Sequence, residues 1–137
     1  MTNQQEAGRL LKRAQYRNHR AADRALAALG TTLVQWDALR AISESPDSSA
    51  HDLAIVTFQS DQAFGTLANR LEAQGLIART SGRGRRVEHA LTAEGARMLK
   101  AGQKVTAGVS ERAFSGLTSA EVEQLRGLLE RVGEVPE

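Results

Sequence analysis

The feature that most constrains the fold is residues 49–91, where two helix starts are followed by two short extended segments. Ser49 opens a Ser-x-x-Asp capping pattern, and Ser60 opens a second amphipathic segment a few residues later. Two capped helices so close together are typical of a helix-turn-helix. Residues 76–80 then change to an extended pattern, and residues 87–91 alternate with the period of two expected of a strand. The expected parts are a winged helix-turn-helix over residues 33–91, its recognition helix at about 60–74 and its wing at about 76–91.

Helical periodicity accounts for the remainder of the chain. Only two prolines occur, and apolar residues recur at helical spacing over residues 5–28, 33–43, 93–114 and 119–132. Thr118 with a Glu three residues later forms a capping box for the last helix. Either Thr31 or Thr32 can cap the helix at 33–43. We therefore expect one domain over residues 1–137, mainly α with a small β-hairpin wing.

Composition excludes several broad classes of protein. The 137 residues are 41% hydrophobic and 25% charged, which is typical of a globular domain with a buried core. No run approaches the roughly 18 apolar residues of a membrane span, and the first residues lack the apolar stretch of a signal peptide, so we expect a cytoplasmic protein. The absence of cysteine excludes disulfides, thiolate metal sites and thiol redox switches.

The net charge of +2 hides an uneven distribution along the chain. Residues 79–91 carry four basic residues and one acidic residue, whereas residues 49–78 carry one basic and three acidic residues. The basic cluster consists of Arg79, Arg83, Arg85 and Arg86, interleaved with two glycines. Such a cationic loop is typical of a surface that binds a polyanion. Alternatively, it is a solvated turn whose arginines pair with nearby carboxylates.

Nothing in the sequence marks a catalytic or metal site. His19, His51 and His89 lie on different elements without the spacing of metal ligands, so we expect structural or solvated roles for them and no bound metal. Neither a Ser-His-Asp arrangement nor a GxGxxG motif after a strand is indicated. We expect a protein that is not an enzyme and needs no cofactor.

Four stretches, LVQWDAL, SSAHDLAIVTFQSDQAFGTLANRLEAQGLIART, RGRRVEHALTAEG and FSGLTSAEVEQLRGLLERV, resemble MarR-type transcriptional regulators over about residues 10–133. The resemblance implies a homodimer joined by helices in residues 5–30 and 93–133. Each subunit would place its recognition helix in a major groove and its wing against the adjacent minor groove. A twofold dimer would read a pseudo-palindromic operator in double-stranded DNA.

The resemblance also implies which residues contact DNA. Base edges would be read by Gln62, Thr66 and Asn69, and phosphates would be bound by Ser60 and Arg70. The wing would add Arg83, Arg85 and Arg86. Two departures from the family pattern are visible: Arg83 stands where an Asp-x-Arg motif usually begins, and Thr66 stands at a position that is often basic. We therefore expect affinity to depend on the wing.

Relatives in this family bind phenolic or aromatic carboxylate effectors near the junction of the two regions. Trp36 is a core residue or a ligand contact at that junction, and Tyr16, His19 and Arg20 are further candidates. The expected function is a dimeric repressor relieved by a small aromatic or phenolic ligand. The alternative is a winged-helix module that binds a protein partner without specific DNA binding, suggested by the acidic and glycine residues of the recognition helix.

Overall fold

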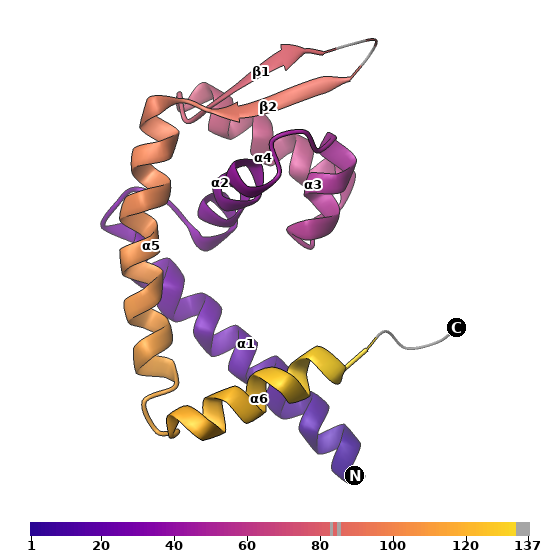
Figure 1. Ribbon diagram of the computed structural model, residues 1–137, viewed down its shortest axis with the longest axis vertical. Helices are drawn as coiled ribbons and strands as arrows, with labels where there is room; N and C mark the ends of the chain where they lie inside the picture. The colour runs from indigo at the N-terminus through magenta and orange to yellow at the C-terminus, as the bar shows by residue number, and fades with distance from the viewer. Residues whose placement is uncertain (83, 85, 134–137) are drawn as a thin grey trace.

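The structure is a computed structural model that describes residues 1–82, 84 and 86–133. Over these residues the chain forms six helices and one antiparallel strand pair (Figure 1). In chain order they are α1 (Asn3–Ala27), α2 (Leu33–Glu44), α3 (Ala50–Val56), α4 (Asp61–Ala73), β1 (Ile77–Ser81), β2 (Val87–Leu91), α5 (Ala93–Ala113) and α6 (Ser119–Arg131). The predicted fold class, mainly helical with a β-hairpin wing, is confirmed.

Serine and threonine side chains start these helices, as the sequence predicts. The Thr32 hydroxyl, rather than that of Thr31, accepts a hydrogen bond from the backbone N–H of Gln35 at 3.2 Å and caps α2. At α6 the predicted capping box forms, since Thr118 and Glu121 each accept a hydrogen bond from the other's backbone N–H. These caps fix where the helices begin and therefore how the connecting turns are placed.

The hydrophobic core lies within the winged lobe, which we define as α2, α3, α4, the hairpin and the adjoining half of α5. Its largest fully buried side chains include Leu39, Ile42, Leu53, Phe64 and Leu71. Leu26 near the end of α1 and Leu99 of α5 join the same cluster. The lobe is thus tied to both long helices by continuous apolar packing.

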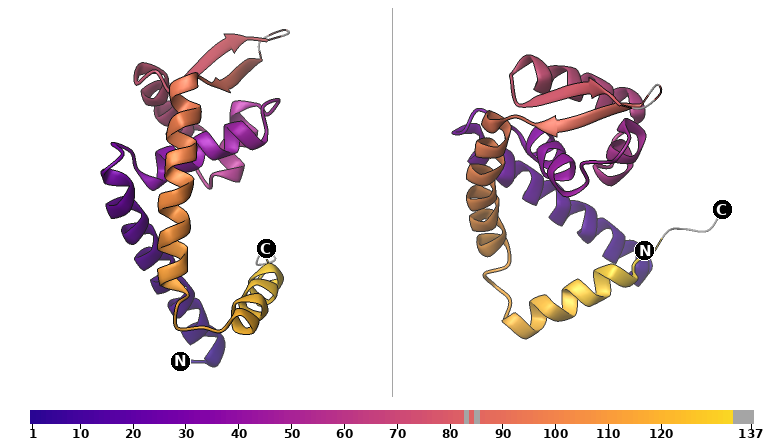
Figure 2. Two further views of the ribbon diagram at one scale, coloured as in Figure 1. Left: turned by 60° about the vertical axis from the view of Figure 1, so that its left-hand side comes forward. Right: turned by 45° about the horizontal axis from the view of Figure 1, so that its top comes forward.

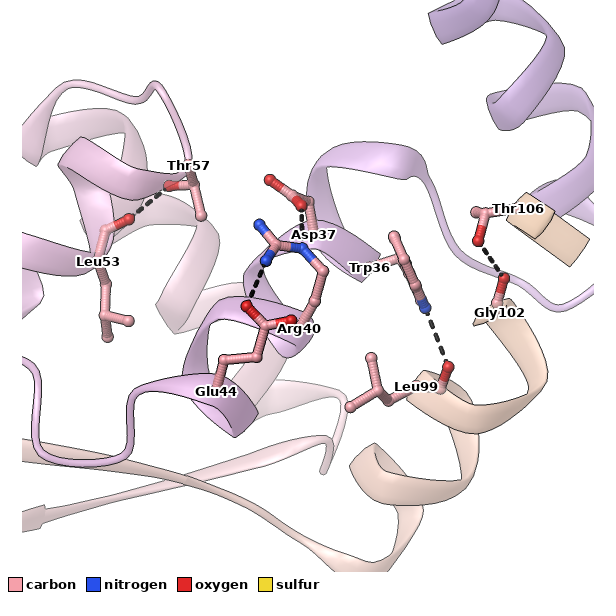
Figure 3. Close-up of polar contacts among 9 residues, drawn as sticks. All are labelled: Trp36, Asp37, Arg40, Glu44, Leu53, Thr57, Leu99, Gly102 and Thr106. Carbon is pink, nitrogen blue, oxygen red and sulfur yellow. Dashed lines mark hydrogen bonds and ion pairs between the residues drawn. The ribbon is translucent and has the colours of Figure 1, made fainter. Parts of the chain in front are cut away.

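Two glycines of α5 allow close approaches that a larger residue would prevent. A Cβ at Gly95 would overlap the backbone carbonyl of Leu76, and a Cβ at Gly102 would overlap the indole of Trp36. The glycines that weaken α5 as an isolated helix therefore let it pack tightly against the winged lobe. Trp36 Nε1 donates to the carbonyl oxygen of Leu99 at 3.1 Å, which fixes the indole between α2 and α5 (Figure 3).

The long helices leave apolar surface uncovered in the single chain. Helices α1 and α5 pack together near the winged lobe and diverge toward α6, which lies at the far end of α5 (Figures 1 and 2). No residue of α6 is buried. Large apolar side chains remain exposed on α1 and around α6, namely Leu10, Leu11, Phe114, Leu117, Leu128, Leu129 and Val132.

Candidate nucleic-acid interface

The turn between α3 and α4 is built by hydrogen bonds within the chain. The buried hydroxyl of Thr57 donates to the carbonyl oxygen of Leu53 at 2.7 Å and ends α3 (Figure 3). Phe58 then adopts a positive φ of 59°, and the Ser60 hydroxyl accepts from the backbone N–H of Ala63 at 3.0 Å to start α4. The local sequence thus produces the predicted helix-turn-helix.

Helix α4 buries one face and exposes the other. Phe64, Leu67, Ala68 and Leu71 form its buried stripe. We define the outward ridge as Gln62, Thr66 and Asn69, which are all exposed and share one face because of their spacing of four and three residues. The predicted base-reading residues therefore lie together on the side of α4 opposite the core.

The residues predicted to bind phosphate flank this ridge. The Ser60 hydroxyl already accepts the capping hydrogen bond, and its own O–H can still donate. Arg70 is exposed beside the ridge. Thr66 Oγ1 donates to the carbonyl oxygen of Gln62 at 3.1 Å, which leaves that hydroxyl oxygen as an acceptor toward solvent.

The wing is a short antiparallel hairpin whose described pairs run from Ile77 with Leu91 to Ser81 with Val87. Two of its predicted DNA contacts, Arg83 and Arg85, lie outside the described residues. Arg86 is described, and its guanidinium donates to the backbone carbonyl of Asp47 in the turn after α2. One of its donors is therefore committed within the protein.

Arg79, the remaining arginine of the basic cluster, is hydrogen-bonded to side chains of α4. Arg79 Nη2 donates to Asn69 Oδ1 at 2.6 Å and to Glu72 Oε1 at 2.9 Å, both on α4. The backbone N–H of Arg79 also donates to Glu72 Oε2 at 3.2 Å. The pairing with a nearby carboxylate that the sequence left open is thus found for Arg79, although this residue lies in β1 and not in a solvated turn.

The three histidines have separate environments. His89 is 4% exposed behind α4, with its ring 5.9 Å from that of Phe64 and no hydrogen-bond partner for Nδ1. Burial, with a smaller contribution from Arg79, lowers the pKa of His89. His51 Nδ1 lies 2.8 Å from Asp61 Oδ1, and this hydrogen bond raises the pKa of His51. Within the described part of the chain, no three His, Asp or Glu side chains gather where they would hold a metal ion.

A cavity of about 320 Å³ that is widely open to solvent lies beside Trp36, where α1, α2 and α5 meet. Its polar lining includes Asn18 of α1 and Gln103, Thr106 and Ser110 of α5. Among the four residues predicted to bind a ligand, Trp36 lines this cavity, whereas Tyr16, His19 and Arg20 do not.

Those three residues interact with other parts of α1. Arg20 Nη1 donates to the Tyr16 hydroxyl at 3.1 Å, and His19 Nε2 lies 3.3 Å from Asp23 Oδ2. The polar residues of the cavity were not singled out from the sequence. Their signal is faint, since it consists of polar side chains on helix faces that are otherwise apolar.

Comparison with known proteins identifies the family. The MarR family model matches residues 29–86. The HTH-type transcriptional repressor Rv2887 of Mycobacterium tuberculosis is 32% identical over 111 residues, which are 80% of this chain and 80% of the relative. The chain belongs to the MarR family.

Solved MarR family structures extend the likeness beyond the matched segment. Rv2887 in complex with DNA superposes with a TM-score of 0.75 at 30% identity, covering 93% of this chain and 97% of that one. Rv2887 in complex with salicylic acid superposes with a TM-score of 0.76 at 31% identity, covering 92% and 95%. The likeness therefore includes the long helices α1 and α5 as well as the winged lobe.

Two further findings bear on this MarR family member. Among the described residues, no helix combines the length and the apolar character needed to cross a membrane. Each of the two acidic residues of α4 has a basic partner, Asp61 with His51 and Glu72 with Arg79. Glu72 is therefore neutralised by Arg79, and Asp61 is neutralised when His51 is protonated, so α4 presents less negative charge than its sequence alone indicates.

Proposed function

We propose that this chain is a sequence-specific regulator that binds double-stranded DNA and represses transcription as a cytoplasmic homodimer, without enzymatic activity. The observation that carries the proposal is the outward ridge of α4, a row of hydrogen-bonding side chains on the exposed face of the helix after a helix-turn-helix. The relative Rv2887 has been solved in complex with DNA. Repression by occlusion of a promoter requires no further chemistry.

In this proposal α4 enters the major groove and the wing follows the adjacent minor groove. Gln62, Thr66 and Asn69 contact base edges, while Ser60 and Arg70 bind phosphates at the groove edge. The wing tip contributes Arg83, Arg85 and Arg86 to phosphates or to the minor groove, and one donor of Arg86 is already used by Asp47. The remaining donors of Arg86 suffice for a phosphate contact.

The dimer is proposed from the uncovered apolar surface of the long helices. Residues 5–30 and 93–133 would form the dimerisation region of a single domain over residues 1–137. Exposed leucines on α1 and α6 support this assignment, because a monomer gains stability by burying such surface against a second copy.

The cavity beside Trp36 is the proposed effector site. Rv2887 has been solved with salicylic acid, so a small phenolic ligand is the chemistry to test first. Ligand binding can shift DNA affinity only if it favours one placement of the winged lobe relative to the long helices. The cavity touches both α2 of the lobe and the long helices α1 and α5. The effector proposal rests on Trp36, and Tyr16, His19 and Arg20 are secondary candidates on α1.

Trp36 is the one tryptophan of the chain, so its fluorescence reports on this cavity directly. We expect salicylate to change the emission of Trp36 and to release DNA over the same concentration range. Unchanged emission at concentrations that release DNA would place the effector elsewhere. Absence of both effects would contradict regulation by this phenolic acid.

The DNA-binding proposal is tested by gel-shift titration of genomic fragments at several salt concentrations. We expect preference for particular fragments over random DNA, and a salt slope that falls by about 0.9 for each phosphate contact removed in Arg85→Ala or Arg86→Ala. Arg40→Ala is the matched control, since Arg40 is an arginine of α2 that pairs with Asp37 and Glu44 and lies outside both the proposed DNA contacts and the proposed dimerisation region. Equal affinity for random and genomic DNA would instead favour the protein-interaction module.

A further inference from the structure

Asn69 differs from the other residues of the outward ridge because a second element restrains its side chain. Arg79 of β1 reaches across to α4, and its Nη2 donates to Asn69 Oδ1 at 2.6 Å. The same guanidinium donates to Glu72 Oε1 at 2.9 Å, one turn further along α4. Gln62 and Thr66 have no comparable contact with a side chain of another element among the described residues.

The chemistry of the guanidinium decides which way the Asn69 amide points. A guanidinium has donors and no acceptor, so the group that faces it must be the amide oxygen. The reversed amide would place its NH₂ against the N–H groups of Arg79. The Nδ2 group of Asn69, with both of its N–H donors, is therefore turned away from Arg79, on a side chain that is exposed.

Glu72 holds the guanidinium in this position. Its carboxylate accepts from both the side chain and the backbone N–H of Arg79, at 2.9 and 3.2 Å. The hydrogen bond from Arg79 lowers the pKa of Glu72, so the carboxylate stays ionised at neutral pH. The side chain of Arg79 is only 25% exposed. Its positive charge is matched within the protein, which makes it a poor candidate for a phosphate contact.

We propose that Arg79 is a positioning residue that makes Asn69 a donor toward DNA and thereby sets which base it reads. This inference rests on the proposed function. An unrestrained asparagine can bind adenine with donor and acceptor together, through N7 and N6. Arg79 occupies one of the two lone pairs of Oδ1 and holds the amide with its N–H donors turned away. Asn69 therefore favours an edge that presents acceptors, which are guanine O6 and N7 or thymine O4. Cytosine, which presents only an amino group there, is disfavoured, and adenine is disfavoured because its N6 amino group lies beside the Asn69 donors and only N7 can accept.

The test measures base preference position by position. A fragment bound by the wild-type protein is varied to all four base pairs at each position of one half-site. Asn69→Ala identifies the position that Asn69 reads, since discrimination is lost there. At that position we expect the wild type to favour guanine or thymine over adenine or cytosine by roughly tenfold.

Arg79→Ala frees the amide to turn over, so this preference should collapse while the salt slope stays unchanged. Arg79→Lys should retain the preference, because an ammonium group also only donates. Arg40→Ala is the matched control for removing an ion-paired arginine from the lobe, since Arg40 pairs with Asp37 and Glu44 on α2 (Figure 3). Arg40→Ala should leave the base preference unchanged at every position of the half-site.

The outcomes separate this inference from the function on which it rests. If the wild type shows no preference among fragments, both fail. If the wild type binds specifically but Arg79→Ala keeps the wild-type preference at the Asn69 position, the positioning role of Arg79 is overturned. Specific binding that Asn69→Ala leaves unaltered at every position overturns it as well.

Discussion

Trp36 and Gly102 occupy the point where the winged lobe meets α5, and their fit is sensitive to a single methyl group. A Cβ at residue 102 would overlap the indole, which cannot move away because Trp36 Nε1 is bonded to the carbonyl of Leu99. We expect Gly102→Ala to lower the free energy of unfolding by about 1–3 kcal/mol, as overpacked substitutions do. Urea denaturation followed by Trp36 fluorescence measures this change.

Gly108 on the same helix supplies the control. A Cβ there would meet only the flexible end of the Arg112 side chain. Gly108→Ala should raise the free energy of unfolding by up to about 1 kcal/mol, because alanine loses less backbone entropy in a helix. Destabilisation of similar size in both variants would mean that α5 tolerates no added methyl groups and that Trp36 is not the cause.

Phe58 is a second residue whose local conformation lowers the free energy of unfolding. It holds a left-handed backbone, with φ of 59°, while its side chain is 93% exposed and so contributes little packing. Left-handed conformation costs a residue with a Cβ roughly 1–2 kcal/mol. Phe58→Gly should therefore raise the free energy of unfolding by about 1 kcal/mol, measured by thermal or urea unfolding.

Phe58→Ala separates backbone strain from the aromatic ring. Alanine retains the strain and removes the ring, so stability should change little. If alanine stabilises the protein as much as glycine does, exposure of the ring and not the backbone is the source of the cost.

At the level of elements, the parts that depend on local sequence were predictable. Caps, apolar periods and the basic tip predicted the order of helices, the hairpin and the outward ridge of α4, because each depends on neighbours within a few residues. The contact of Arg79 with Asn69 was not predicted, since it joins β1 to α4 and no periodicity marks it. The cavity beside Trp36 was not predicted for the same reason, because residues from three helices line it.

Helix α4 is approached by histidines of two other elements, and their effects on stability have opposite signs. His89 of β2 packs behind α4, near Phe64, Arg79 and Glu72, with its pKa below the ordinary 6.5 mainly because it is buried. As pH falls below 6.5, the unfolded chain binds a proton that the folded protein resists, so stability declines. His51 has a raised pKa, so its pairing with Asp61 contributes stability below 6.5 that is lost as pH rises through the raised value.

We therefore expect the two histidine variants to change the acid side of the stability profile in opposite directions. In urea denaturation between pH about 7.5 and about 5.5, His89→Gln should lose less stability on acidification than the wild type. His51→Gln should lose more, because the compensating gain from its pair with Asp61 is removed. Parallel profiles for both variants would show that neither histidine titrates differently in the folded protein.

In the whole molecule, the proposed DNA-binding surface and the proposed dimer interface lie at opposite ends. The winged lobe holds the buried core and the outward ridge, whereas α6 lies away from the lobe at the far end of α5 (Figure 2). Exposed leucines lie on α1, on α6 and in the turn between α5 and α6. Residues 117–137 also carry five acidic and two basic residues, so this end repels a phosphate backbone while the wing attracts it. The molecule is thus polarised, with the proposed DNA-binding surface at one end and the proposed dimer interface at the other.

This polarity predicts that a charge placed on α6 will abolish assembly without damaging the winged lobe. Leu129 is 43% exposed on α6 in the single chain, and we expect Leu129→Glu to convert a dimer into a monomer in sedimentation at micromolar concentration. Ile55→Glu, an equivalent change at an exposed apolar residue of α3 in the winged lobe, should leave the dimer intact.

The affinity for DNA should also depend on the dimer that α6 is proposed to form. A twofold dimer presents its two recognition helices about 34 Å apart, one turn of DNA, so it gains affinity when both half-sites are present at that spacing. Leu129→Glu should lose this gain and bind a fragment with two half-sites only as tightly as a fragment with one. If the wild type sediments as a monomer, or if Leu129→Glu keeps the advantage of the second half-site, the apolar surface of α6 is not the dimer interface.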